Sequence, residues 1–159
     1  MADSVSYPSE LFPARPSITL SAPDAWSALP LAEVVVAVAK EHAADEFRPN
    51  VVVAVSRNTP DFTLEMAVGA IAQKLIGLTD REEVVNVATE ISGFAAHRIE
   101  VTFSDPRVGT IAQAVTLVLV PNGGFVDLVQ LTGSCTASQI ESTFGEIRSI
   151  LSTAVVAKL

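Results

Sequence analysis

Three residues in one short segment, His97, Arg98 and Glu100, are the first candidates for chemistry in this sequence. If the segment is a strand, side chains two apart share a face, so Arg98 and Glu100 point one way, about 7 Å apart, and His97 points the other. Arg57, on another predicted strand, could join Arg98 and Glu100. These three residues indicate a charged patch that grips a partner or, as the plainer interpretation, an exposed ion pair worth under about 1 kcal/mol.

His97 and Cys135 are the residues that could support catalysis. Histidine can serve as an acid, base or metal ligand, but His97 shares its face with apolar residues, and the sequence places no partner within its reach. Cys135 precedes a predicted helix, whose dipole could lower a thiol pKa, yet its apolar surroundings favour a buried, inert thiol. His42 lies among polar residues at a predicted strand end and is interpreted as solvated.

Motifs that usually carry an enzyme's chemistry are absent from the sequence. There is no G-x-G-x-x-G, P-loop, G-x-S-x-G or H-E-x-x-H pattern, which removes the main support for nucleotide, hydrolase and zinc-protease functions. A single cysteine cannot form an intrachain disulfide or a zinc site with paired thiolates. We therefore expect no catalytic residue, no metal and no cofactor.

Composition narrows the class of protein further. The chain has 159 residues, a formal net charge of −8, 49% hydrophobic residues and 18% charged residues, which argues against disorder. Nucleic acids and anionic membranes require clustered Lys and Arg, so neither is an expected partner. The first residues do not read as a secretory signal, and the uncharged stretch 108–126 is interrupted by turn residues. We expect an acidic, soluble, cytoplasmic protein without a membrane span.

Periodicity then predicts the elements. Three prolines mark residues 1–16 as an irregular arm, and residues 17–159 read as a single domain. Valine-rich or alternating segments predict strands at 17–20, 34–42, 51–55, 83–91, 95–104, 110–120 and 125–132. An apolar stripe predicts a helix from Asp61 to Gly77, with Thr59 as its N-cap. A second helix follows a capping box between Thr136 and Gln139.

The order of these elements defines the fold class. Consecutive strands joined by short turns pair antiparallel, and Asn122-Gly123 is the strongest turn signal, typical of a type I′ hairpin with positive φ at both residues. Two amphipathic helices can each cover one face of such a sheet. We expect an α+β fold, an antiparallel sheet of about six to seven strands with helices on both faces.

Several of these segments also resemble a known family. Residues 17–20 with Trp26, the strand start at 49–53, and residues 131–135 before the last helix are similar to the actinobacterial LpqN-type lipoproteins, whose architecture is that of the wider Mog/PsbP-like α/β/α sandwich. The resemblance covers residues 17–155 and implies a binding or interaction module, with no catalytic residues to transfer. Family lipoproteins carry a leader and an acylated cysteine. Since Cys135 lies far downstream, we expect an unanchored relative or a chain whose leader has been removed.

Three functions follow as hypotheses. The first is a non-catalytic domain that binds a protein or a small apolar ligand in a groove between the sheet and one helix. Its candidate binding residues are Arg57, His97, Arg98, Glu100 and Trp26. The second is a small hydrolase or transferase that uses His97 with Glu100 or Cys135. The third is a homodimer that pairs through an exposed sheet edge or an apolar patch.

Overall fold

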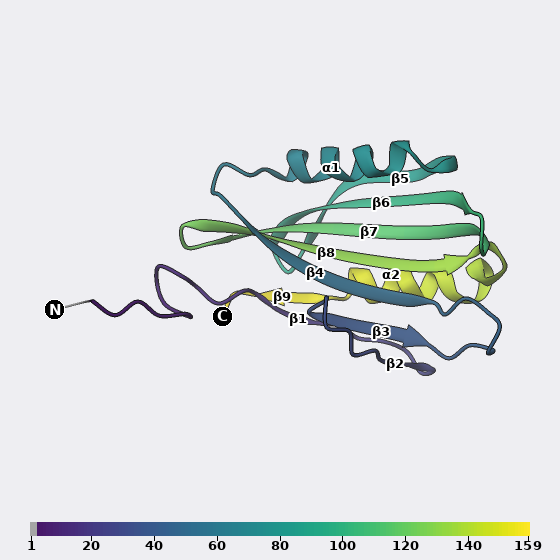
Figure 1. The fold of residues 1–159 in the computed structure, drawn as a ribbon, viewed down its shortest axis with the longest axis horizontal. Coiled ribbons are helices and arrows are strands. Elements are labelled where there is room, and N and C mark those ends of the chain that lie inside the picture. Colours follow the sequence, from purple (N-terminus) through teal and green to yellow (C-terminus); the bar gives the residue numbers. More distant parts are fainter. Residues whose placement is uncertain (1–2) are drawn as a thin grey trace.

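Seven antiparallel strands form one sheet, in the order β2-β3-β4-β8-β7-β6-β5, in a computed structural model that describes residues 3–159 (Figure 1). They are β2 (Trp26–Ala28), β3 (Val36–Lys40), β4 (Asn50–Asn58), β5 (Thr79–Ile91), β6 (Phe94–Asp105), β7 (Gly109–Asn122) and β8 (Phe125–Thr136). A separate pair joins β1 (Ser17–Thr19) to β9 (Val155–Ala157). Between Asp3 and Pro16 the chain forms neither helix nor strand.

The four long strands β5 to β8 pair in chain order, as their short turns predicted. The turn between β7 and β8 differs from the prediction: Asn122 pairs with Phe125, so the two central residues are Gly123 and Gly124. Only Gly123 has positive φ, +61°. A type I′ turn needs positive φ at both central residues, and the expectation of one at Asn122-Gly123 is therefore wrong.

Helix α1 (Leu64–Ile76) lies on one face of the sheet and begins later than predicted. Its N-cap is Thr63, whose side chain accepts a hydrogen bond from the backbone N–H of Met66, and not Thr59. Both threonines suit the role, but the Thr59 hydroxyl donates to Asp61 Oδ1 instead of accepting from the backbone of the first helical turn. Gly77 ends the helix, as expected.

The last helical segment lies on the opposite face and is less regular than predicted. The capping box is present, since the Thr136 N–H donates to Gln139 Oε1 at 3.0 Å. The helical segment begins with a single 3₁₀ turn (Ala137–Gln139), which is followed by a π-helical turn (Ile140–Phe144) and then by helix α2 (Gly145–Ser152). Lys40 on β3 binds this π-helical turn through Thr143 Oγ1, 3.1 Å away, and α2 through Glu146 Oε1, 2.6 Å away.

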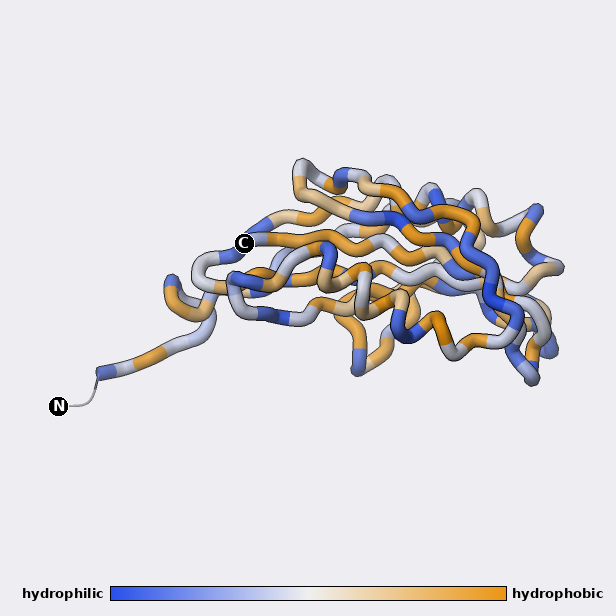
Figure 2. The backbone as a smooth tube through the Cα atoms, turned by 90° about the horizontal axis from the view of Figure 1, so that it is seen from above, coloured by the Kyte–Doolittle hydropathy of each residue, from blue (hydrophilic) through white to orange (hydrophobic). Residues whose placement is uncertain are grey.

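The two helices cover separate cores on opposite faces of the sheet, which confirms the predicted fold class. Ala67, Ile71 and Leu75 of α1 pack on residues of β6 and β7, whereas Ile147 and Ile150 of α2 pack on the other face. Figure 2 shows apolar segments running through the interior and hydrophilic segments at many of the turns. No helix among residues 3–159 is long and apolar enough to cross a membrane.

Candidate functional site

Arg98 and Glu100 share the face of β6 that α2 covers, as strand alternation predicted. In register, Arg98 lies opposite Thr116 of β7 and Glu100 lies opposite Ala114. Glu100 is only 1% exposed, so the expectation of an exposed ion pair between Arg98 and Glu100 is wrong. Its partner is instead Arg148 of α2, which donates from Nη2 to Oε1 at 2.7 Å and from Nε to Oε2 at 3.0 Å.

The pair with Glu100 fixes the position of the Arg148 guanidinium. A hydrogen bond from Arg148 to Glu100 raises the pKa of the arginine, against the effect of burial, so the group stays charged. The guanidinium also lies over the ring of Phe144, 4.6 Å from its centroid. Of its five donors, those on Nη1 make no hydrogen bond to any residue from 3 to 159. Arg148 is therefore held by Glu100 along one edge of its guanidinium, while its side chain stays 49% exposed.

A small cavity of about 50 Å³ lies beside this pair, between α2 and strands β5 to β7. We call it the α2–β6 cavity; its lining includes Arg98, Glu100, Thr116 and Arg148, with Ile91 and Leu151 as apolar walls. Thr116 is 2% exposed, and its hydroxyl makes no hydrogen bond within the described residues. The buried side-chain atoms without a partner in the described residues are Trp26 Nε1 and Arg48 Nε, so the Thr116 hydroxyl is not a sealed polar atom but one that faces the cavity.

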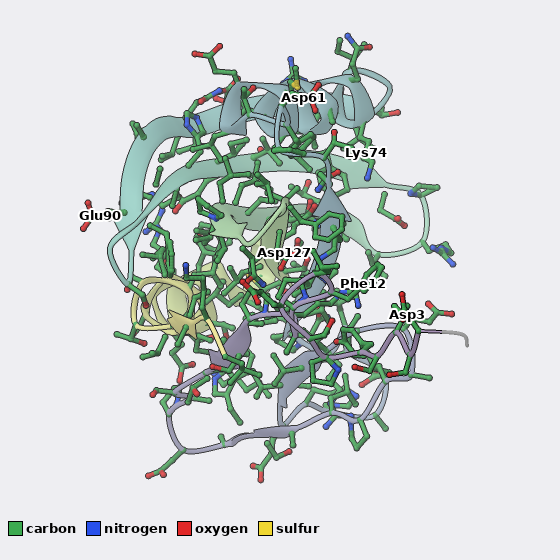
Figure 3. The ribbon with its side chains drawn as sticks, turned by 90° about the vertical axis from the view of Figure 1, so that its left-hand side faces the viewer. Asp3, Phe12, Asp61, Lys74, Glu90 and Asp127 are labelled. Atoms are coloured by element: carbon green, nitrogen blue, oxygen red, sulfur yellow. The ribbon has the colours of Figure 1, made fainter. Side chains whose placement is uncertain are left out.

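Arg57 does not join this cluster, although the sequence suggested that it could. It lies on β4, and two strands separate it from β6, which corresponds to roughly 14 Å at ordinary strand spacing. Its guanidinium instead binds Asp127 of β8 and the carbonyl oxygen of Pro13 in the N-terminal arm. Figure 3 shows Asp127 in the interior of the molecule. Arg57 therefore binds inside the protein, to Asp127 and the N-terminal arm, and does not contribute to the cluster around Glu100.

The remaining predicted residues lie apart from one another. His97 points to the α1 side of the sheet, where its Nε2 contacts Asn86 Oδ1 of β5. Cys135 is fully buried on the α2 side, and burial raises the pKa of its thiol to about 11, slightly opposed by the charge of Lys40. Trp26, 9% exposed on β2, belongs to the core. The structure therefore does not assemble His97, Glu100 and Cys135 into one reactive site.

Two residues of the site were missed from the sequence. Arg148 directly follows the core residue Ile147 on α2, and only that position beside the apolar stripe hints that its stem reaches the sheet. Thr116 lies within an apolar strand and carries no signal of its own. Within residues 3–159 no group of three or more His, Cys, Asp or Glu side chains is placed to hold a metal ion.

A protein-family model described as "Probable lipoprotein LpqN" matches residues 9–157. The chain belongs to this family. A similar solved structure is LpqN of Mycobacterium tuberculosis, described as involved in cell envelope biogenesis, with a TM-score of 0.76, 20% identity and coverage of 89% of this chain and 84% of that one. The resemblance predicted from the sequence is thereby confirmed. No curated protein matches this LpqN-family chain.

Two further structures share the fold of this LpqN-family chain. PsbP of the cyanobacterium Synechocystis has a TM-score of 0.58 and 14% identity, and the match covers 97% of this chain and 98% of that one. The Ran-binding protein Mog1p of Saccharomyces cerevisiae has a TM-score of 0.54 and 12% identity, covering 86% and 88%. They confirm the Mog/PsbP-like fold. The family's description as lipoproteins gives no support to the expected cytoplasmic location.

Proposed function

We propose that this LpqN-family chain is a non-catalytic module that binds a partner protein in the groove between α2 and strands β5 and β6. The carrying observation is that Arg98 lines the cavity beside α2 with Arg148 and Glu100 and is itself exposed. Its register neighbour Val87 of β5 is exposed on the same face, at 45%. An apolar residue beside a charged one at the edge of a groove is typical of a protein contact surface.

The geometry gives the alternative hydrolase or transferase little support. His97 and Glu100 lie on opposite faces of β6, and the Cys135 thiol is buried and protonated at neutral pH. Nucleophilic catalysis requires a base within hydrogen-bond reach of the nucleophile. A non-catalytic role also agrees with the Ran-binding protein that shares the fold.

Self-association through the sheet edge is the remaining alternative, because β5 is a 13-residue edge strand. Edge strands present unpaired backbone groups that can pair with another chain. However, residues 79–91 contain four acidic side chains and one arginine, for a net charge of −3. Two copies paired along β5 would bring like charges together at short distance. A different partner therefore fits this edge of the molecule better than a second copy.

Affinity capture from the native cell tests the proposed groove. We expect a partner that is retained by the wild-type chain and lost with Arg98→Glu, which reverses the charge at the groove. The matched control is Arg107→Glu in the β6–β7 turn, where the side chain is 88% exposed and distant in register from Arg98. Equal capture by all three chains would contradict the proposal.

A further inference from the structure

We propose that Arg98, Arg148 and Thr116 form a binding site for a carboxylate group in the α2–β6 cavity. This inference rests on the proposed function, because it names the chemistry by which a partner would be held in the groove. Three features of the cavity support it: the guanidinium of Arg148 is positioned by Glu100, and the cavity is also lined by the Arg98 guanidinium and the Thr116 hydroxyl, neither of which has a hydrogen-bond partner within residues 3–159.

Arg148 supplies the pre-positioned group. Glu100 holds one edge of its guanidinium and Phe144 covers one of its planar faces, so little side-chain entropy remains to be lost when a ligand binds. The donors on Nη1 stay available. A guanidinium presents its donors in a fixed fork that matches a carboxylate. The buried Glu100 thus acts as a positioning residue for Arg148.

Arg98 supplies the second positive charge. It forms no ion pair and no side-chain hydrogen bond within residues 3–159, although it lines the same cavity as Arg148. Together with Glu100, the two arginines leave a local net charge of +1 in a chain whose formal charge is −8. A single negative charge matches this site, whereas a doubly charged phosphate would leave excess negative charge beside Glu100.

Size and polarity also favour a carboxylate. The cavity of about 50 Å³ exceeds the roughly 10–15 Å³ that one water needs on the same measure, so it can take a small group such as a carboxylate. The Thr116 hydroxyl can donate to a carboxylate oxygen from the floor of the cavity. Ile91 and Leu151 form the apolar part of the cavity wall.

Sodium acetate is the probe for the first experiment. We expect its addition to shift the Nε–Hε resonances of Arg98 and Arg148 and the amide of Thr116 in a saturable manner, while sodium chloride at equal ionic strength does not. Loss of a charge-assisted hydrogen bond predicts at least about tenfold weaker binding by Arg98→Gln. Thr116→Val, which replaces the hydroxyl with a methyl group of similar size, should also weaken binding. Arg107→Gln, in an exposed turn, should leave binding unchanged.

Peptides then distinguish the source of the carboxylate. A tripeptide with a free C-terminus, its amide, and an amidated peptide with one internal aspartate are compared as competitors of acetate. If only the tripeptide with a free C-terminus competes, the carboxylate that binds is a chain terminus. If the amidated peptide with an internal aspartate competes, the carboxylate is an acidic side chain. Absence of saturable acetate shifts, identical affinity of Arg98→Gln, or tighter binding of phosphate than of acetate would overturn the carboxylate site.

The two proposals fail in different ways. If the captured partner depends on Arg98 but acetate does not bind, the groove function stands and the carboxylate site is rejected. If acetate binds in the cavity but capture does not depend on Arg98, the carboxylate site stands and the proposed partner-binding function is rejected.

Discussion

Arg57 and Asp127 form a bidentate ion pair across the β4–β8 ladder, with Nε–Oδ1 and Nη2–Oδ2 distances of 2.8 Å each. Asp127 is 0% exposed, and Asn122 donates a further hydrogen bond to its Oδ2 at 2.9 Å. Arg57 and Asn122 also hold the N-terminal arm in place. Arg57 Nη1 donates to the carbonyl oxygen of Pro13 and Asn122 Nδ2 donates to that of Ala14, both at 2.8 Å. One buried carboxylate therefore organises the contact between arm and sheet.

Removing the arginine should destabilise the fold strongly. Arg57→Leu leaves the Asp127 carboxylate buried without its countercharge, and such changes cost about 3–5 kcal/mol. Arg57→Leu with Asp127→Leu should recover much of this loss, since an apolar pair can replace a buried ion pair. Urea unfolding measures both. Arg81→Ala, which breaks only the surface contact with Glu83 at 4.0 Å, serves as control and should change stability by under about 1 kcal/mol.

The same pair predicts an acid-sensitive contribution to stability. Burial would raise the pKa of Asp127, but hydrogen bonds from Arg57 and Asn122, with the positive charge of Arg57, lower it below its usual value. A lowered folded pKa stabilises the fold above the unfolded value of about 3.9, and this stabilisation is lost as pH falls toward the folded pKa. The wild-type unfolding free energy should therefore drop below about pH 4 by more than that of the double leucine variant.

The arm should loosen when its second anchor is removed. Asn122→Ala deletes the hydrogen bond to the Ala14 carbonyl and one of those to Asp127. Glutamyl endopeptidase should then cleave after Glu10 several-fold faster, since a lost buried hydrogen bond costs about 1–3 kcal/mol. The Asn58→Ala variant, which loses only a local hydrogen bond to the Ser56 carbonyl, should be cleaved at the wild-type rate. Equal rates for both variants would show that Arg57 alone suffices to hold the arm.

The strands and the helix stripes could be predicted from the sequence because both depend on local periodicity. Residues 95–104 alternate between two cores, and this alone placed Arg98 and Glu100 on one face. The partner of Glu100 could not be predicted in this way. Arg148 reaches it from a helix 48 positions later, so the pairing depends on how α2 packs on the sheet. Periodicity also does not give the order of strands in the sheet, and this is why Arg57 was predicted to join Arg98 and Glu100 although two strands separate them.

Close packing of α2 on β8 depends on the glycine at position 133. A Cβ added to Gly133 would lie 2.3 Å from Ile147 Cγ2, so Gly133→Ala should cost at least about 1–3 kcal/mol through overpacking. Ile147→Leu lacks that methyl group, and the two changes together should be less damaging than their sum. Gly69→Ala is the matched control. An alanine there meets nothing within 4 Å on an exposed helix position, and it should stabilise the protein by about 0.5–1 kcal/mol. Urea unfolding of the four variants measures the coupling.

The thiol of Cys135 provides the test that separates a binding module from a cysteine-based enzyme. Burial raises its pKa to about 11, so at pH 7.5 we expect native protein to resist iodoacetamide for hours, whereas protein unfolded in urea reacts within minutes. Because the folded pKa exceeds the unfolded value of about 8.5, the contribution of Cys135 to stability should be constant below that pH and fall as pH rises toward 11. Rapid modification of the folded chain at neutral pH would instead mean an accessible thiolate. That result would restore the nucleophile which the geometry around Cys135 argues against.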